Sequence, residues 1–142
     1  MITNETQIRV RYGETDRMGY VYYGNYLLYY EVGRTEMIRQ LGLTYRQLED
    51  NGTLLPVHSV QIKYIAPATY DDLLTIRTIL REYPGVSITF EYEIINSAGK
   101  IINTGEVKLV FVDVKTNRPT RAPKYFLDLV DPYFNEKKNS LS

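Results

Sequence analysis

The fold is decided by the stretch GNYLLYYEVGRTEMIRQL, residues 24–41 of the 142-residue chain. One set of its residues recurs at steps of three or four, as residues on one face of a helix do: Tyr26, Tyr30, Gly33, Met37 and Leu41. Glycine costs about 1 kcal/mol relative to alanine inside a helix, so Gly33 on this face indicates that another backbone packs closely there. The pattern predicts one long, mostly buried helix that ends at Gly42.

Strand patterns lie on both sides of this helix. Before it, apolar and polar residues alternate over residues 7–12, which predicts a half-buried strand. After it, a capping box formed by Thr44 and Gln47 predicts a short helix. The remaining elements are expected to be four strands, joined mostly by short turns, and a last short helix: 59–64, 73–81, 86–94, around 107–111, and 124–130. One long helix followed by a run of strands predicts an α+β fold in which an antiparallel sheet covers the helix.

The length and charge of the chain restrict its class. A chain of this size buries roughly two-thirds of its unfolded surface, so we expect one domain over residues 1–142, with a polar tail at 135–142 that frays. Lys and Arg together number 17, as do Asp and Glu, so no net charge attracts nucleic acid. No apolar run reaches the ~18 residues of a membrane span, and the N-terminus lacks a signal-peptide pattern. We therefore expect a cytoplasmic protein with neither a nucleic-acid nor a membrane partner.

The residue types that the chain lacks restrict its chemistry. It has no cysteine, which excludes disulfides, thiolate metal sites and cysteine nucleophiles. His58 is the single histidine, so no histidine pair is present to bind zinc. If the protein is an enzyme, its catalysis must therefore use carboxylates, hydroxyls and backbone amides.

The segment ETDRMGYVYYGNY, residues 14–26, has the features of a catalytic loop. It places the Asp16 carboxylate a few residues before the long helix, whose first turn has free N–H groups and a partial positive charge. Gly24 allows a ligand to approach that backbone closely. A carboxylate beside such an amide pair is the minimum needed to hydrolyse an activated acyl group. The alternative is that Asp16 only caps a turn.

Two motifs resemble the 4-hydroxybenzoyl-CoA thioesterase family of hotdog-fold proteins. The first combines loop and helix residues: Thr15-Asp16, Gly19, Val21, Tyr23, Asn25-Tyr26, Glu31 and Arg34. The second is ATYDDLLTI at residues 68–76, and the order of elements fits over residues 8–114. The resemblance implies a hotdog fold, which is a five-stranded antiparallel sheet wrapped around one long helix. It also implies a homodimer or homotetramer with the active site at the subunit interface, and hydrolysis of acyl-CoA to a carboxylic acid and CoA without a metal or redox cofactor.

The resemblance also assigns roles to individual residues. Asp16 falls on the family's catalytic Asp, which is either the nucleophile or the general base for water. Tyr23 falls where a backbone N–H polarises the thioester carbonyl, and Gly24 helps to form that turn. A large branch of the family has His where this chain has Tyr23, whereas the 4-hydroxybenzoyl-CoA branch has Tyr, so the identity of the acyl group stays open. Tyr22 and Tyr26 are candidates for lining the acyl pocket.

Four further residues are candidates outside this loop. Glu31, on the long helix, is the second candidate for the catalytic carboxylate, because a helical Glu fills that role in another hotdog branch. Arg118 and Arg121, in a basic loop flanked by prolines, are candidates for binding the CoA phosphates. His58 shares strand parity with Val60, so we expect an inward-facing, hydrogen-bonded core residue.

Three alternative functions stay open on the sequence. The first is a hotdog protein that binds acyl-CoA without cleaving it, and the second is a thioesterase that acts on acyl carrier protein. The third is a hotdog hydratase or dehydratase. Those enzymes usually pair a catalytic His with Asp or Glu, and His58 lies far from the Asp16 loop in the sequence.

Overall fold

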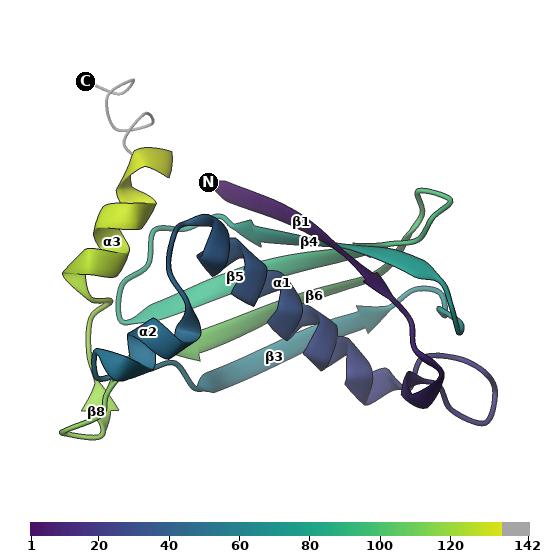
Figure 1. Cartoon of the computed structure of the whole chain (residues 1–142), viewed down its shortest axis with the longest axis horizontal. Coiled ribbons are helices and arrows are strands. Elements are labelled where there is room, and N and C mark those ends of the chain that lie inside the picture. Colours follow the sequence, from purple (N-terminus) through teal and green to yellow (C-terminus); the bar gives the residue numbers. More distant parts are fainter. Residues whose placement is uncertain (135–142) are drawn as a thin grey trace.

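The computed structural model describes residues 1–134, so the predicted fraying of residues 135–142 lies outside the described part. One five-stranded antiparallel sheet, in the order β1-β4-β5-β6-β3, carries the helix α1 (Tyr26–Gln40) along one face (Figure 1). Its strands are β1 (Ile2–Arg9), β3 (Val57–Tyr64), β4 (Leu73–Leu80), β5 (Ser87–Ile95) and β6 (Ile101–Val110). The predicted α+β hotdog architecture, a five-stranded sheet around one long helix, is confirmed.

Two glycines face bulky side chains where the helix α1 packs on the sheet. A Cβ atom at Gly33 would overlap with Thr78 Oγ1 and lie 3.0 Å from Ile76 Cγ2. The atoms nearest to this glycine therefore belong to side chains of β4 and, through Tyr92 at 3.3 Å, of β5. On β6, a Cβ atom at Gly105 would overlap with the Tyr30 hydroxyl. The absence of side chains at these two positions lets the helix lie directly on the sheet.

The first strand lies earlier in the chain than predicted. β1 pairs with β4 from Ile2 opposite Leu80 to Arg9 opposite Leu73, so the length of β4 sets where β1 ends. Tyr12, placed in the strand by its alternation, instead begins a 3-10 turn, Tyr12–Glu14, and is exposed. The chain therefore leaves the sheet three residues before the predicted end and enters the loop that carries Asp16.

The other connections follow the prediction, with one addition. In α2 (Tyr45–Asp50), Thr44 Oγ1 accepts from Gln47 N–H at 3.1 Å and Gln47 Oε1 accepts from Thr44 N–H at 2.9 Å, which confirms the capping box. The helix α3 (Lys124–Val130) is also present, followed by a 3-10 turn, Asp131–Tyr133. A small sheet of three two-residue strands was not predicted: β2 (Thr53–Leu54), β7 (Val112–Asp113) and β8 (Arg118–Pro119).

His58 is exposed, so the prediction of an inward-facing histidine was wrong. The register of β3 against β6 shifts between Val57 and Ser59, and this irregularity removes His58 from the alternation that Val60 follows. β3 is also an edge strand of the sheet.

Within residues 1–134, no helix has the length and hydrophobicity that a bilayer crossing requires.

Candidate active site

The loop between β1 and α1 closes on itself at Asp16. Thr15 and Val21 form an isolated antiparallel bridge, and Asp16 N–H donates to the Tyr20 carbonyl at 2.8 Å. Gly19 adopts φ 80°, a left-handed conformation that glycine tolerates, and donates its N–H to the Asp16 carbonyl at 3.0 Å. The result is a tight turn with Asp16 at its base.

The two oxygens of the Asp16 carboxylate have different surroundings. Oδ1 accepts hydrogen bonds from the N–H groups of Met18 at 2.8 Å and Tyr20 at 3.2 Å. Oδ2 has no hydrogen-bond donor among residues 1–134. One oxygen therefore holds the turn, as the simpler interpretation of the sequence expected, while the other is available for chemistry.

The start of the long helix presents free donors. A 3-10 turn, Tyr23–Asn25, leads directly into α1, and its first residue receives no side-chain cap. Asn25 N–H donates to the Tyr22 carbonyl at 2.9 Å, whereas the N–H groups of Tyr23 and Gly24 have no acceptor among the residues that the structure describes. These are the unsatisfied N-terminal amides that favour a negative charge. A Cβ atom at Gly24 would lie 3.2 Å from the Tyr22 ring, so the glycine leaves room for that ring.

Glu14 ties this helix start to the Asp16 loop. Its backbone oxygen accepts from Tyr22 N–H and from Asn25 Nδ2, both at 2.9 Å. Its carboxylate accepts from the Tyr29 hydroxyl at 3.1 Å and from Arg11 N–H at 2.8 Å. Burial, together with the neighbouring Glu14 charge, raises the pKa of Tyr29, so this hydroxyl stays a hydrogen-bond donor.

A cavity of about 360 Å³ brings the predicted residues together. It is lined by aromatic, apolar and loop residues: Asp16, Met18, Tyr20, Val21, Tyr23, Tyr26, Tyr64, Ile65, Ala66 and Pro67. Asp16, Tyr23 and Tyr26, which the sequence singled out, therefore border one space. Their catalytic and binding roles stay predictions.

Tyr64 is one of the lining residues that sequence reasoning missed. Its ring lies edge-on to those of Tyr23 and Tyr26, with centroids 6.5 and 5.5 Å away, and its hydroxyl donates to the Tyr23 carbonyl at 3.1 Å. The available signal was its parity with Ile62 on a strand that ends just before the break at Pro67.

Gly24 is not among the lining residues, and four further predicted residues also lie outside this cavity. Tyr22 is exposed, with its ring centroid 4.6 Å from that of Tyr23. Glu31 is exposed on α1, whereas Arg34 of the same helix is buried beside Tyr45 and Tyr92. Arg118 and Arg121 are exposed at β8 and just after it, at the end of the molecule opposite to the Asp16 loop (Figure 1). Within one chain, the arginines and Asp16 are therefore not brought together.

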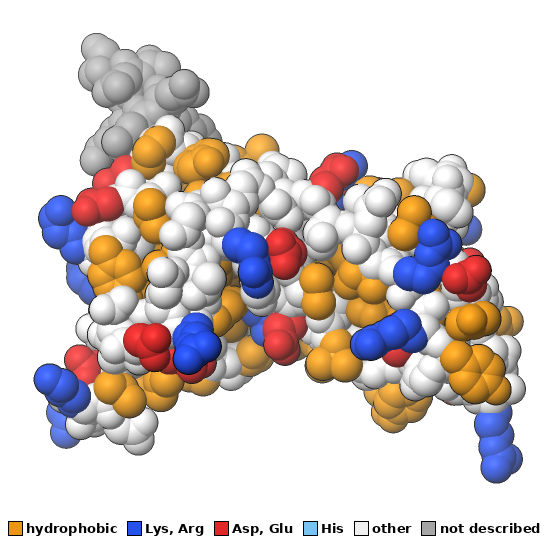
Figure 2. All heavy atoms as spheres, in the orientation of Figure 1, with side chains coloured by type: hydrophobic (Ala, Val, Ile, Leu, Met, Phe, Trp, Pro, Cys, Tyr) orange, Lys and Arg blue, Asp and Glu red, His pale blue; other side chains and the backbone are white. Residues whose placement is uncertain are grey.

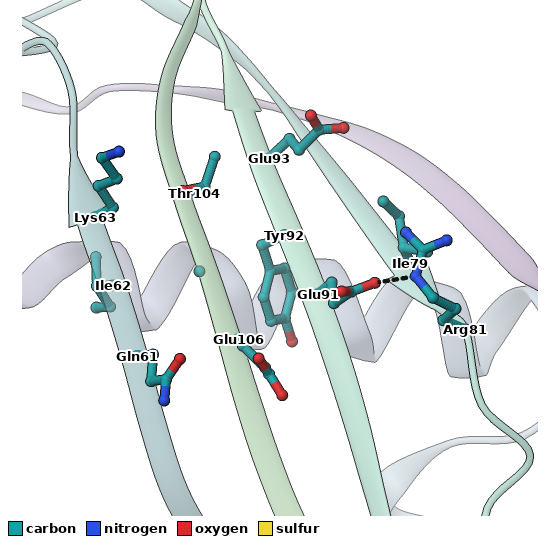
Figure 3. Close-up of a pocket in the computed structure, with 11 residues that line it drawn as sticks. Gln61, Ile62, Lys63, Ile79, Arg81, Glu91, Tyr92, Glu93, Thr104 and Glu106 are labelled. Carbon is teal, nitrogen blue, oxygen red and sulfur yellow. Dashed lines mark hydrogen bonds and ion pairs between the residues drawn. The ribbon is translucent and has the colours of Figure 1, made fainter.

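A second hollow, of about 510 Å³, lies on the face of the sheet opposite to α1 (Figure 3). Its charged residues include Lys63, Glu106 and the ion pair of Arg81 with Glu91, at 2.7 Å. None of the predicted site residues borders it. Within the part of the chain that the structure describes, no group of three or more His, Asp or Glu side chains could hold a metal ion.

The fold and this site define a class of protein, a hotdog-fold hydrolase of thioesters. The sequence model of the thioesterase-like superfamily matches residues 10–130. "Putative acyl-CoA thioesterase YneP" of Bacillus subtilis is 36% identical over 138 residues, which cover 97% of this chain and 100% of that protein. The acyl-CoA thioester hydrolase YbgC of Escherichia coli is 35% identical over 117 residues, 82% of this chain and 87% of that protein.

A solved structure agrees over the whole chain. The DHNA-CoA thioesterase of Staphylococcus aureus has a TM-score of 0.88 at 32% identity, covering 100% of this chain and 97% of that one. The chain belongs to the thioesterase-like superfamily, and the predicted resemblance and hydrolase class are confirmed.

Proposed function

We propose that this protein hydrolyses acyl-CoA thioesters with Asp16 as the catalytic carboxylate and the start of α1 as the oxyanion site. One observation carries the proposal: Asp16 and Tyr23, at the helix start, line one cavity of about 360 Å³. Among residues 1–134, the N–H groups of Tyr23 and Gly24 have no acceptor. The names of the similar YbgC and YneP proteins support CoA as the thiol carrier. The overall reaction is acyl-CoA plus water to carboxylic acid plus CoA.

The geometry divides the work between two groups. The carbonyl oxygen of the thioester accepts from the N–H groups at the helix start, which stabilise the negative charge that develops on it. Oδ2 of Asp16 then either attacks the carbonyl carbon or takes the proton of the attacking water. Because Oδ1 is held by Met18 and Tyr20 N–H, the carboxylate keeps its orientation before substrate arrives.

We further propose that a second copy of the chain covers β3 and the exposed side of α1. β3 is an edge strand, and hydrophobic side chains are exposed along the lower edge of the molecule (Figure 2), on these elements and the residue after β3: Leu27, Leu28, Val32, Val57, Val60, Tyr64 and Ile65. A twofold axis that pairs β3 with itself makes the pairing antiparallel. Such a homodimer removes both the open edge and the apolar patch. The homotetramer implied by the resemblance stays a prediction.

This pairing gives Arg118 and Arg121 a role that one chain cannot provide. Antiparallel pairing puts the Val57 end of one β3 beside the Tyr64 end of the other. The Val57 end carries the small sheet, because Val57 lies opposite Leu109 and β7 pairs with β8 just beyond it. The arginines of one subunit therefore lie near the Asp16 cavity of the other, where they bind the CoA phosphates.

The test is thiol release from a panel of aryl, short-chain and long-chain acyl-CoA esters, with acyl carrier protein esters beside them. Turnover of a CoA ester supports the proposal and names the acyl group. Turnover of carrier-protein esters alone moves the substrate to that class. Binding of CoA esters without any thiol release contradicts hydrolysis and favours the non-catalytic alternative. The cytoplasmic location stays a prediction.

A further inference from the structure

Tyr64 contacts the helix start from a different element. It is the last residue of β3, 41 positions beyond Tyr23 in the sequence, and its hydroxyl donates to the Tyr23 carbonyl at 3.1 Å. The edge-on contacts of its ring with Tyr23 and Tyr26 hold that hydroxyl in place. Partial burial raises the pKa of Tyr64, so the hydroxyl is protonated and remains a donor.

The carbonyl that Tyr64 binds belongs to the same peptide unit as the Gly24 N–H. Because a peptide unit is planar, the direction of its carbonyl fixes the direction of its N–H. A hydrogen bond to the carbonyl also polarises the unit, which strengthens the N–H as a donor. The preceding unit is held in the same way, since the Tyr22 carbonyl accepts from Asn25 N–H at 2.9 Å and thereby orients Tyr23 N–H.

We propose that Tyr64 is a positioning residue that fixes Gly24 N–H as the second donor of the oxyanion site, beside Tyr23 N–H. This inference rests on the proposed function, because the donors matter only if a thioester carbonyl binds there. It adds to that function a residue on the edge strand that touches the peptide backbone of the site and acts through it.

Tyr64→Phe removes the hydroxyl and keeps the ring that contacts Tyr23 and Tyr26. We expect kcat/KM to fall about 3- to 10-fold, as for the loss of one hydrogen bond. Tyr70→Phe is the matched control, because Tyr70 lies outside the cavity, is exposed, and its hydroxyl has no partner among residues 1–134. It should keep the wild-type kcat/KM.

Two unreactive CoA analogues separate positioning from packing. In the first, CH2 replaces the thioester sulfur and the carbonyl is kept as a ketone; in the second, the carbonyl is replaced by CH2 and the sulfur is kept as a thioether. Tyr64→Phe should weaken binding of the ketone about 3- to 10-fold and leave the thioether unchanged, because only the ketone has an oxygen for the donors. A packing defect would weaken both equally.

The outcomes distinguish the two proposals. If the wild type turns over and Tyr64→Phe keeps the wild-type kcat/KM, the role of Tyr64 is overturned and the proposed function stands. Equal weakening of the ketone and the thioether overturns it as well. A wild-type protein that releases no thiol from any ester overturns the proposed function and this inference with it.

Discussion

Asn25 donates a hydrogen bond from Nδ2 to the backbone oxygen of Glu14 at 2.9 Å, which joins the Asp16 loop to the first turn before α1. The same oxygen accepts from Tyr22 N–H, so the loop and the helix start share one anchor. The carboxylate and the amide donors are positioned relative to one another through this contact.

Replacing Asn25 with Ala should therefore affect catalysis more than stability. Loss of the side-chain donor removes one anchor and is expected to lower kcat about 10-fold, while the free energy of unfolding falls by about 1 kcal/mol. Steady-state kinetics and urea unfolding measure the two effects. Asn51→Ala is a matched control, because Asn51 Nδ2 donates to the Gln47 carbonyl at 2.8 Å on α2. It should cost similar stability and no activity. Equal kcat losses in both variants would contradict the anchoring role.

Gly33→Ala tests the close packing of α1 on β4. The added methyl group overlaps with Thr78 Oγ1, so we expect a loss of about 1–3 kcal/mol in the free energy of unfolding despite the better helix propensity of alanine. Adding Thr78→Ala should recover part of that loss in a double-mutant cycle. Gly85→Ala, where a Cβ atom meets nothing within 4 Å, should change stability little. A Gly33→Ala protein as stable as the wild type would contradict the packing account.

Arg118 and Arg121 test whether the site is shared between subunits. Replacing both with Ala should raise KM for acyl-CoA about 10-fold and leave KM for acyl-pantetheine unchanged, because the latter lacks the nucleotide phosphates. Arg39→Ala, which replaces an exposed arginine on α1, is the charge control.

Mixing the Arg118→Ala, Arg121→Ala double variant with Asp16→Asn subunits should restore low-KM turnover, since one site per mixed dimer then has a wild-type Asp16 and wild-type arginines. Light scattering should give two or four times the mass of the 142-residue chain. A monomer, or no restoration, would refute the shared site.

The contact between Tyr83 and Asp131 predicts a pH dependence. The Tyr83 hydroxyl donates to Asp131 Oδ1 at 2.5 Å, and this hydrogen bond raises the pKa of Tyr83 to about 12 from its ordinary value of 10.0. Since the folded-state pKa is the higher one, the stabilising contribution is complete below pH 10 and is lost as pH rises toward 12. The difference in melting temperature between wild type and Tyr83→Phe should shrink between about pH 10 and pH 12. Tyr133→Phe is the control, and a difference that does not change with pH would contradict the assignment.

The sequence predicted the parts of this molecule that depend on local patterns. The alternation on β5, the helical face around Tyr30 and the capping box at Thr44 each arise from residues close together in the chain, so the structure matches them. The three-stranded sheet was missed because strands of two residues show no alternation. His58 was misplaced because a register shift of one residue reverses the direction in which a side chain points.

The site, too, was predictable only where its residues lie close together in the sequence. Asp16, Tyr23 and Gly24 lie within nine residues and share one motif, so their proximity follows from the sequence. Tyr64 reaches the Tyr23 carbonyl from another strand, and no local pattern encodes that contact. The proposed approach of the arginines to Asp16 rests on the pairing of two chains, which a single sequence does not specify.

The central claim is that Asp16 is the catalytic carboxylate, and Asp16→Asn tests it most directly. The substitution keeps an Oδ1 acceptor for Met18 and Tyr20 N–H, so the loop should stay folded. Thiol release from the best acyl-CoA ester should fall about 10²- to 10⁴-fold, while affinity for the thioether analogue and the circular dichroism spectrum stay those of the wild type. A variant that keeps wild-type turnover would contradict the account and direct attention to Glu31.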